Sequence, residues 1–187
     1  MKSIVLVGCT KTKRPGLLPA FLKYQASPWF TAMWDLGLKL ATDPNKDIYI
    51  LSAKHGLLHP LEQIEDYEQA LPTSQKDRLP WATRIYVDLL ARVPRTEAVT
   101  FNLLCGQRYR EPLGGLLRLT AGAAWETFAP FANTPGIQAQ IVEAGKLANS
   151  IDQIDHFLDT VPMAVYRRAI MADWVGGDNP WASGTSY

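Results

Sequence analysis

Hydrophobic and polar positions alternate along this chain in blocks that predict an α/β fold. Apolar, β-branched runs at Ser3–Val7, Asp47–Ser52 and Glu97–Leu104 have the composition of strands buried on both faces. Between the first two runs, apolar residues recur at helical spacing after Ser27-Pro28, a capping hydroxyl followed by proline. The order strand, helix, strand predicts a parallel unit, and we take Asp47–Ser52 as the central strand.

The second half of the chain predicts further helices. A helical segment begins after Pro72, is interrupted by Pro80 and continues over Trp81–Ala91. A short helix follows at Leu113–Leu119. The stretch Ala121–Thr134 is compatible with a last strand or with an aromatic-lined loop over a cleft.

The C-terminal part is predicted to be helical. We expect one helix from Gly136 to about Asn149, a second from Ser150 or Asp152, and a last one from Pro162. The prediction is a single α/β domain with a mostly parallel central sheet flanked by helices. Its parts are a core over residues 1–132, C-terminal helices packed on the core over 133–175, and a flexible tail over 176–187.

Composition narrows the function classes. The chain has 187 residues, 47% of them hydrophobic and 20% charged, with a formal net charge of +1. A near-neutral chain has no global field toward nucleic acid or membrane, so any anion binding must be local. The absence of a long apolar stretch leads us to expect a cytoplasmic protein without a membrane partner. Two cysteines do not make a disulfide framework.

Polar and basic residues follow each of the three predicted strands directly. The segments are Cys9–Arg14, Ser52–His55 and Cys105–Arg110. If the strands are parallel, their carboxyl ends meet at one edge, where open α/β sheets bind ligands. That edge would collect the basic side chains Lys11, Lys13, Arg14, Lys54, His55, Arg108 and Arg110. Each segment alone also fits a solvated turn, but together they predict an anion such as the phosphate of a nucleotide or nucleic acid.

The sequence is also compatible with other chemistry at this edge. The acids of residues 62–68 could supply a general base, although each also fits a solvated turn. Cys9, Cys105 and His55 are possible ligands for zinc, but no ligand spacing supports a metal site, and no cofactor is expected. A cysteine nucleophile with His55 as base is conceivable, while a cysteine at a strand end often only packs.

Several motifs resemble those of a known superfamily. They are Cys9-x-Lys11-x-Lys13, Tyr24-x-x-Ser27-Pro28-x-Phe30, Ile50-Leu51-Ser52-Ala53-Lys54-His55-Gly56-Leu57-Leu58-x-Pro60, Ile64-x-x-Tyr67 and Gly106-x-x-Tyr109. Together they resemble an uncharacterised domain family related to YaaA, a peroxide-stress protein linked to DNA protection. The chain departs from the YaaA pattern at Lys54-His55 and Asp66-Tyr67-Glu68. Its Cys9–Lys13 start is also similar to a catalytic segment of archaeosine synthase, without the histidine found there.

The resemblance implies work on a nucleobase in DNA, RNA or a nucleotide, and relatives of this kind occur near DNA-modification and phage-defence systems. We therefore expect an enzyme that recognises a base, most simply a modified one, and cleaves its N-glycosidic bond. The candidate catalytic residues are Asp66, His55, Lys54 and Glu65. The candidate substrate-binding residues are Cys9, Thr10, Lys11, Lys13, Ser27, Ser52, Tyr67, Gly106, Gln107, Arg108 and Tyr109.

Three alternatives stay open at this point. Within the enzyme class, Lys54 or Lys13 could act as a Schiff-base nucleophile instead of a carboxylate mechanism. A non-catalytic DNA-binding or DNA-protection protein would use the same cations for salt-dependent binding. A small-molecule nucleotide hydrolase or transferase would bind nucleotides and ignore polymers. The sequence leaves the oligomeric state open.

Overall fold

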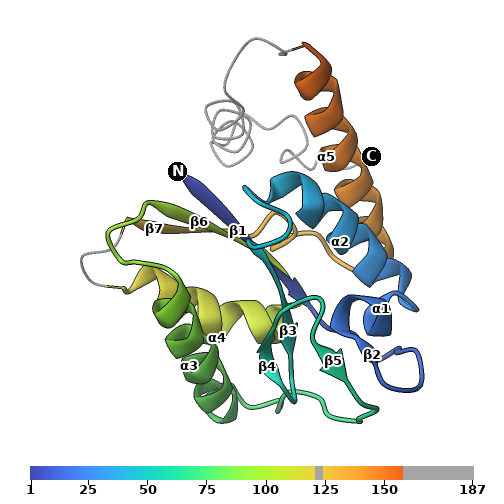
Figure 1. Ribbon diagram of the computed structural model, residues 1–187, viewed down its shortest axis with the longest axis vertical. Coiled ribbons are helices and arrows are strands. Elements are labelled where there is room, and N and C mark those ends of the chain that lie inside the picture. Colours follow the sequence, from blue (N-terminus) through green and yellow to red (C-terminus); the bar gives the residue numbers. More distant parts are fainter. Residues whose placement is uncertain (121–123, 158–187) are drawn as a thin grey trace. The chain divides into compact units, whose positions relative to one another are not determined.

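A computed structural model describes residues 1–120 and 124–157 of the chain (Figure 1). It is a mixed α/β fold whose five-stranded sheet has the order β4-β3-β1-β6-β7. The strands are β1 (Lys2–Gly8), β2 (Leu18–Pro19), β3 (Ile48–Ser52), β4 (Gly56–Leu58), β5 (Gln63–Ile64), β6 (Val99–Leu104) and β7 (Trp125–Phe128). The helices are α1 (Ala20–Tyr24), α2 (Pro28–Leu40), α3 (Gln75–Arg92), α4 (Gln107–Arg118) and α5 (Ile137–Phe157).

The sheet is mostly parallel, as the sequence predicts. β1 runs parallel to β3 on one side and to β6 on the other, and β7 is parallel to β6. The prediction that Asp47–Ser52 forms the central strand is wrong, because β1 is central and β3 lies between β1 and the antiparallel strand β4. The tight turn from Ser52 to Gly56, where Gly56 has a φ of +81°, makes this reversal possible.

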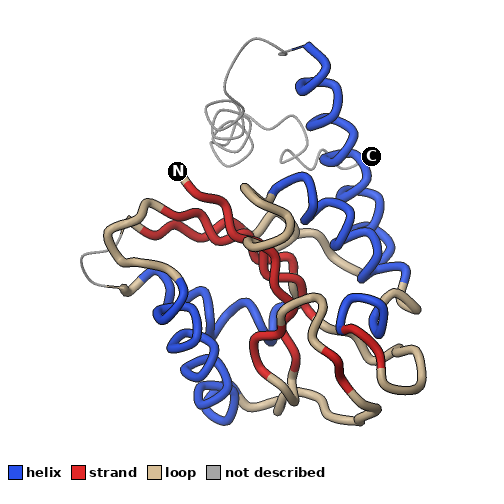
Figure 2. The backbone as a smooth tube through the Cα atoms, in the orientation of Figure 1, coloured by secondary structure: helices blue, strands red, loops and turns tan. Residues whose placement is uncertain are grey.

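Helices cover both faces of the sheet (Figure 2). On one face, Trp81 and Ile85 of α3 and Leu113 of α4 join the core formed by Ile4 and Leu6 of β1. The intervening residues of β1 point to the other face, where α2 packs so closely that a Cβ at Gly37 would lie 3.2 Å from Val5 Cγ1. This two-sided burial explains why the strands read as continuous apolar runs.

The prediction that Pro80 interrupts a helix is wrong. α3 is one helix over Gln75–Arg92 with Pro80 inside it. Pro80 lies in the second turn, so the missing amide affects only the N-terminal end, and the buried face carrying Trp81, Ile85 and Leu89 holds the helix in place. Pro112 lies at the corresponding place in α4, which begins at Gln107 and not at Leu113.

Two other expectations are settled by packing. Residues 125–128 form strand β7, so the alternative of an aromatic-lined loop is wrong there, and Trp125 is buried against Phe101 of β6 with their ring centroids 5.1 Å apart. α5 is a single helix over Ile137–Phe157, where two helices were predicted. No glycine or proline lies between Asn149 and Asp152, so nothing in the backbone chemistry requires a break.

The chain divides into two units, residues 1–148 and residues 149–187, and only residues 149–157 of the second are described. The predicted helix from Pro162 and the predicted tail over 176–187 lie outside the described residues. The boundary expected between residues 132 and 133 stays a prediction. Within the described part of the chain, no helix has the length and apolar character needed to cross a membrane.

Candidate functional site

The carboxyl ends of three parallel strands meet at one edge of the sheet. β1 ends at Gly8, directly before Cys9; β3 ends at Ser52; and β6 ends at Leu104, directly before Cys105. Because β3, β1 and β6 are parallel neighbours, the polar segments that follow them lie on the same side. We call the residues 9–17, 52–55 and 105–110 the carboxyl edge. Its existence confirms the topological part of the sequence prediction.

A hydrogen-bonded group of buried hydroxyls lies under this edge. The Tyr67 hydroxyl lies 2.9 Å from Ser52 Oγ and also hydrogen-bonds the Tyr24 hydroxyl. Ser52 Oγ in turn accepts a hydrogen bond from the backbone N–H of His55 at 3.1 Å. Burial raises the pKa of Tyr67 to about 12 and raises the pKa of Tyr24 further. Both phenols therefore keep their protons at neutral pH and act as hydrogen-bond donors.

The Cys9 thiol lies beside a third tyrosine. Its Sγ is 3.3 Å from the Tyr109 hydroxyl, and Cys9 itself is half-buried. The Tyr109 ring meets Trp81 edge-on with centroids 5.1 Å apart, and Trp81 Nε1 donates to the Ser52 carbonyl at 2.8 Å. These contacts connect β1, β3, α3 and α4. The thiol is thus connected through Tyr109 and Trp81 to Ser52, which lies far from both in the sequence.

Two lysines approach the same tyrosine ring. Lys13 Nζ is 4.4 Å and Lys54 Nζ is 5.4 Å from the centroid of Tyr67. Lys13 also donates to the carbonyl of Lys11 at 3.2 Å, within the loop after β1. A tyrosine ring attracts ammonium groups through its π-electrons without cancelling their charge. The arrangement therefore brings positive charge to the carboxyl edge and leaves it available for an anion.

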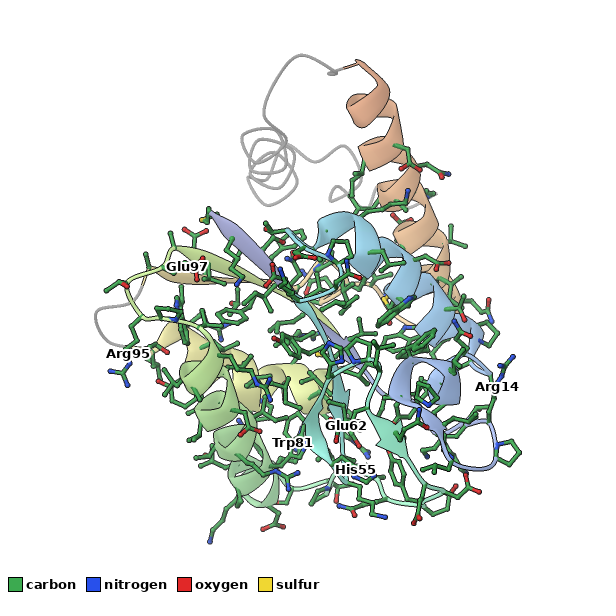
Figure 3. The ribbon with its side chains drawn as sticks, in the orientation of Figure 1. Arg14, His55, Glu62, Trp81, Arg95 and Glu97 are labelled. Atoms are coloured by element: carbon green, nitrogen blue, oxygen red, sulfur yellow. The ribbon has the colours of Figure 1, made fainter. Side chains whose placement is uncertain are left out.

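His55, in the turn between β3 and β4, also contacts Tyr67. Its ring meets Tyr67 edge-on with centroids 5.1 Å apart. Burial, and after it the charge of Lys54, lowers the pKa of His55, while Glu62 acts in the opposite direction. The imidazole is therefore neutral at neutral pH and able to accept a proton. Figure 3 shows His55, Glu62 and Trp81 near this end of the sheet, whereas Arg95 and Glu97 lie toward the other end.

The carboxylate of Asp66, a predicted catalytic residue, has a different environment. Asp66 forms an ion pair with Lys23, and its two oxygens accept from the backbone N–H of Gly16 at 3.1 and 3.0 Å. The Lys23 hydrogen bond, followed by that of Gly16, lowers the pKa of Asp66. Because these partners occupy the carboxylate, we propose no role for Asp66 as a general acid or base. Glu65, the other candidate, is exposed.

The remaining predicted binding residues do not all reach the cluster around Tyr67. Ser27 is buried as the N-cap of α2, where its hydroxyl accepts from Phe30 N at 3.4 Å. Thr10 donates to the carbonyl of Thr12 at 3.0 Å. Gln107 pairs with Glu111 at 2.6 Å on the exposed first turn of α4. Lys11, Gly106 and Arg108 are exposed on the carboxyl edge.

Sequence reasoning missed four side chains that build this region. Trp81 and Arg78 belong to α3, and Arg78 is buried with Nη1 donating to the Arg108 carbonyl at 3.2 Å. Lys23 is fully buried and Tyr24 lies beside it on α1. Only Tyr24 carried a signal, because it falls within one of the motifs quoted above. An arginine or a lysine in a polar helix looks exposed until its tertiary partner is known.

No group of three or more His, Cys, Asp or Glu side chains within the described residues is arranged to hold a metal ion. Burial raises the pKa of the Cys105 thiol to about 12, so this cysteine stays a neutral packing residue at neutral pH. The functional groups present at the carboxyl edge are amines, guanidinium groups, a half-buried thiol, an imidazole and protonated phenols.

Comparison with known proteins places the chain in a family without assigning a function. No curated protein matches it. Residues 4–141 match the model of a family of unknown function, DUF6884. This range includes all three segments of the carboxyl edge and the tyrosines beneath it. The chain therefore belongs to the DUF6884 family.

Proposed function

We propose that this protein is a nucleobase-directed enzyme that acts on DNA or on a nucleotide and cleaves an N-glycosidic bond at the carboxyl edge. The observation that carries the proposal is the meeting of Lys13 and Lys54 over the ring of Tyr67, beside the Cys9 thiol and a neutral His55. The motifs around Leu51–Tyr67 support the same direction, because they resemble a family related to YaaA, and we infer a common superfamily.

The cations of the edge are assigned to the phosphate. Lys13 is half-buried and fixed by its bond to the Lys11 carbonyl, so it offers a preoriented charge. Lys11 and Arg108 are exposed on either side and can add further contacts, Arg108 with a bidentate guanidinium. A cationic rim of this kind selects a phosphorylated substrate over a free nucleoside.

Lys54 is assigned as the nucleophile. His55 accepts a proton from the Lys54 ammonium, and the free nitrogen attacks C1′ of the sugar. The C1′–N bond to the base breaks, its electron pair leaves with the base, and the base takes up the proton held by His55. The C1′–O4′ bond then breaks as O4′ takes one proton from the attached Lys54 nitrogen, which leaves a protonated Schiff base between C1′ and Lys54, and water hydrolyses this Schiff base to free the lysine. This route needs no carboxylate, which fits the engagement of Asp66 with Lys23.

The buried tyrosines have supporting roles in this scheme. Tyr67, expected from the sequence to bind substrate, is 8% exposed with its ring against the two lysines, so its ring is not free to stack on a base. Its role is to hold the ammonium groups near one another. Tyr109 is half-buried with its hydroxyl 3.3 Å from Cys9 Sγ, and we assign these two residues to contact with the base.

The test is product analysis with covalent trapping. The protein is incubated with unmodified and hypermodified phage DNA and with free nucleotides, with and without sodium borohydride, and products are identified by mass spectrometry. We expect a released base and, with borohydride, a sugar adduct on Lys54. Lys46→Met, at the opposite edge of the sheet, is the matched control and should behave as wild type.

Each other outcome has a definite meaning. Base release without a trapped adduct would replace the amine mechanism with attack by water. Salt-sensitive DNA binding without any release would overturn the enzyme proposal and leave a DNA-binding protein. Release from free nucleotides alone would identify a small-molecule enzyme.

A further inference from the structure

A second charged group lies next to the carboxyl edge and is not used by the proposed reaction. Lys23 is fully buried on α1, whereas the side chain of its partner Asp66 is 63% exposed. Lys23 Nζ also donates to the Gly16 carbonyl, and Asp66 accepts from the Gly16 N–H. We call these three residues the clasp. Each of its members comes from a different segment of the chain.

The clasp holds both sides of the Lys13–Tyr67 contact. Gly16 lies three residues after Lys13, and the Arg14 N–H donates to the Lys23 carbonyl at 2.8 Å. On the other side, Asp66 directly precedes Tyr67 in the chain. The buried ammonium group thus binds the loop that carries Lys13 through the Gly16 carbonyl and the segment that carries Tyr67 through Asp66, while the Arg14 bond is made to the backbone carbonyl of Lys23.

Burial of this lysine is difficult to explain by stability alone. Removing an ammonium group from water is costly, and apolar side chains of similar volume often serve a core as well or better. A buried ion pair is more useful where it fixes one arrangement among several. The clasp provides such a constraint, because the loop between β1 and β2 is otherwise exposed from Arg14 to Leu17.

We propose that Lys23 and Asp66 are positioning residues that hold Lys13 over Tyr67 and so keep the phosphate-binding charge in place. The role of the Lys13 charge in phosphate binding rests on the proposed function. The constraint that Lys23 and Asp66 place on the Lys13 loop does not. Asp66 thereby acquires a role that differs from the catalytic one expected from the sequence.

The decisive variant is Lys23→Met in the full chain. Methionine is a straight-chain residue that can fill the buried space, while the Asp66 carboxylate stays in contact with solvent and with Gly16. The fold should persist, as checked by circular dichroism and urea unfolding, while the loop loses the bond from Lys23 Nζ to the Gly16 carbonyl. Lys46→Met removes a lysine from the exposed ion pair with Asp43 and serves as the control.

The first readout needs no substrate. The rate at which a limiting amine-reactive reagent labels each lysine is measured by mass spectrometry. In wild type, Lys13 should label more slowly than exposed Lys11, and Lys23→Met should raise the Lys13 rate about fivefold as the loop opens locally. An unchanged Lys13 rate in folded Lys23→Met protein would overturn the proposal, whatever the activity proves to be.

The second readout uses the activity. Lys23→Met should raise KM about fivefold with kcat within about twofold, because phosphate binding weakens while Lys54 and His55 keep their places. A fall in kcat at constant KM would contradict the assignment. If Lys23→Met fails to fold, Asp66→Asn takes its place, because it keeps the size and the Gly16 contact but removes the charge. It should raise the Lys13 labelling rate about twofold, and no rise would overturn the proposal.

Discussion

Lysines at the two ends of the parallel strands have different partners. We call residues 2 and 43–47, at the amino ends of β1 and β3, the amino edge. There, Lys2 Nζ lies 3.0 Å from an oxygen of Asp47, and Lys46 Nζ lies 3.2 Å from Asp43. At the carboxyl edge, Lys13 and Lys54 face the ring of Tyr67, and within the described residues neither forms an ion pair. A chain of net charge +1 thus neutralises one edge and leaves the other positive.

This difference indicates which edge binds a ligand. A carboxylate partner cancels the field of an ammonium group, whereas an aromatic ring leaves most of that field directed outward. The neutralised edge can therefore be read as structural, and the positive edge as the place where an anion supplies the missing charge.

The largest effect is expected from Lys54→Met. Loss of the nucleophile should lower base release and borohydride trapping by about a hundredfold or more. Lys2→Met at the amino edge is the matched control, because it removes a lysine from an ion pair. It should leave base release and borohydride trapping within about twofold of wild type. Equal effects of the two substitutions on product yield would erase the functional contrast between the edges.

The second comparison concerns stability. Asp66→Ala leaves the buried Lys23 ammonium without its counter-charge, and we expect the Tm to fall by about 5 °C or more. Asp43→Ala breaks an exposed ion pair at the amino edge and should lower the Tm by about 1–2 °C. Differential scanning calorimetry measures both. A smaller fall for Asp66→Ala than for Asp43→Ala would show that the clasp does not stabilise the fold.

The third comparison tests how tightly the carboxyl edge is packed. A Cβ at Gly8 would lie 2.9 Å from Cys105 Cβ, so Gly8→Ala should cost about 1–3 kcal/mol. Gly115 on α4 has nothing within 4 Å of such a Cβ, and Gly115→Ala should stabilise by up to about 1 kcal/mol. Urea unfolding gives both values, and a neutral Gly8→Ala would mean that β1 and β6 can separate at this edge.

The smallest effect is the pH dependence due to His55. Since burial lowers its pKa in the folded state below the ordinary value of 6.5, its contribution to stability is present above that pH and is lost as the pH falls. Urea midpoints of wild type should therefore decline between pH about 7.5 and about 5, and His55→Gln should decline less. An unchanged slope in His55→Gln would assign the titration to another group.

Much of the fold was predictable because burial on both faces leaves a clear pattern. The apolar runs at β1, β3 and β6 and the helix between the first two predict parallel pairing, which the structure has. The short strands β2, β4 and β5 were not predicted, since two or three residues carry no periodicity. Pro80 misled the helix prediction because its cost depends on its turn within the helix and on tertiary packing.

The candidate site was predicted only in part, and the reason is visible in three lysines and one aspartate. Lys13 and Lys54 follow buried strands, so topology alone brings them to one edge. Asp66 looked equally suited to catalysis, but its partner Lys23 lies 43 residues away in the chain. Pairing of charges over such a separation has no local signature.

The sequence by itself thus determined the three parallel strands β1, β3 and β6 and the gathering of basic side chains at their carboxyl ends, because each follows from periodicity and chain order. Only the tertiary structure decided which charges remain free and which are neutralised. That decision depends on distances between side chains from separate segments, such as Lys23 with Asp66 and Lys13 with Tyr67, and therefore exists only once the chain has folded.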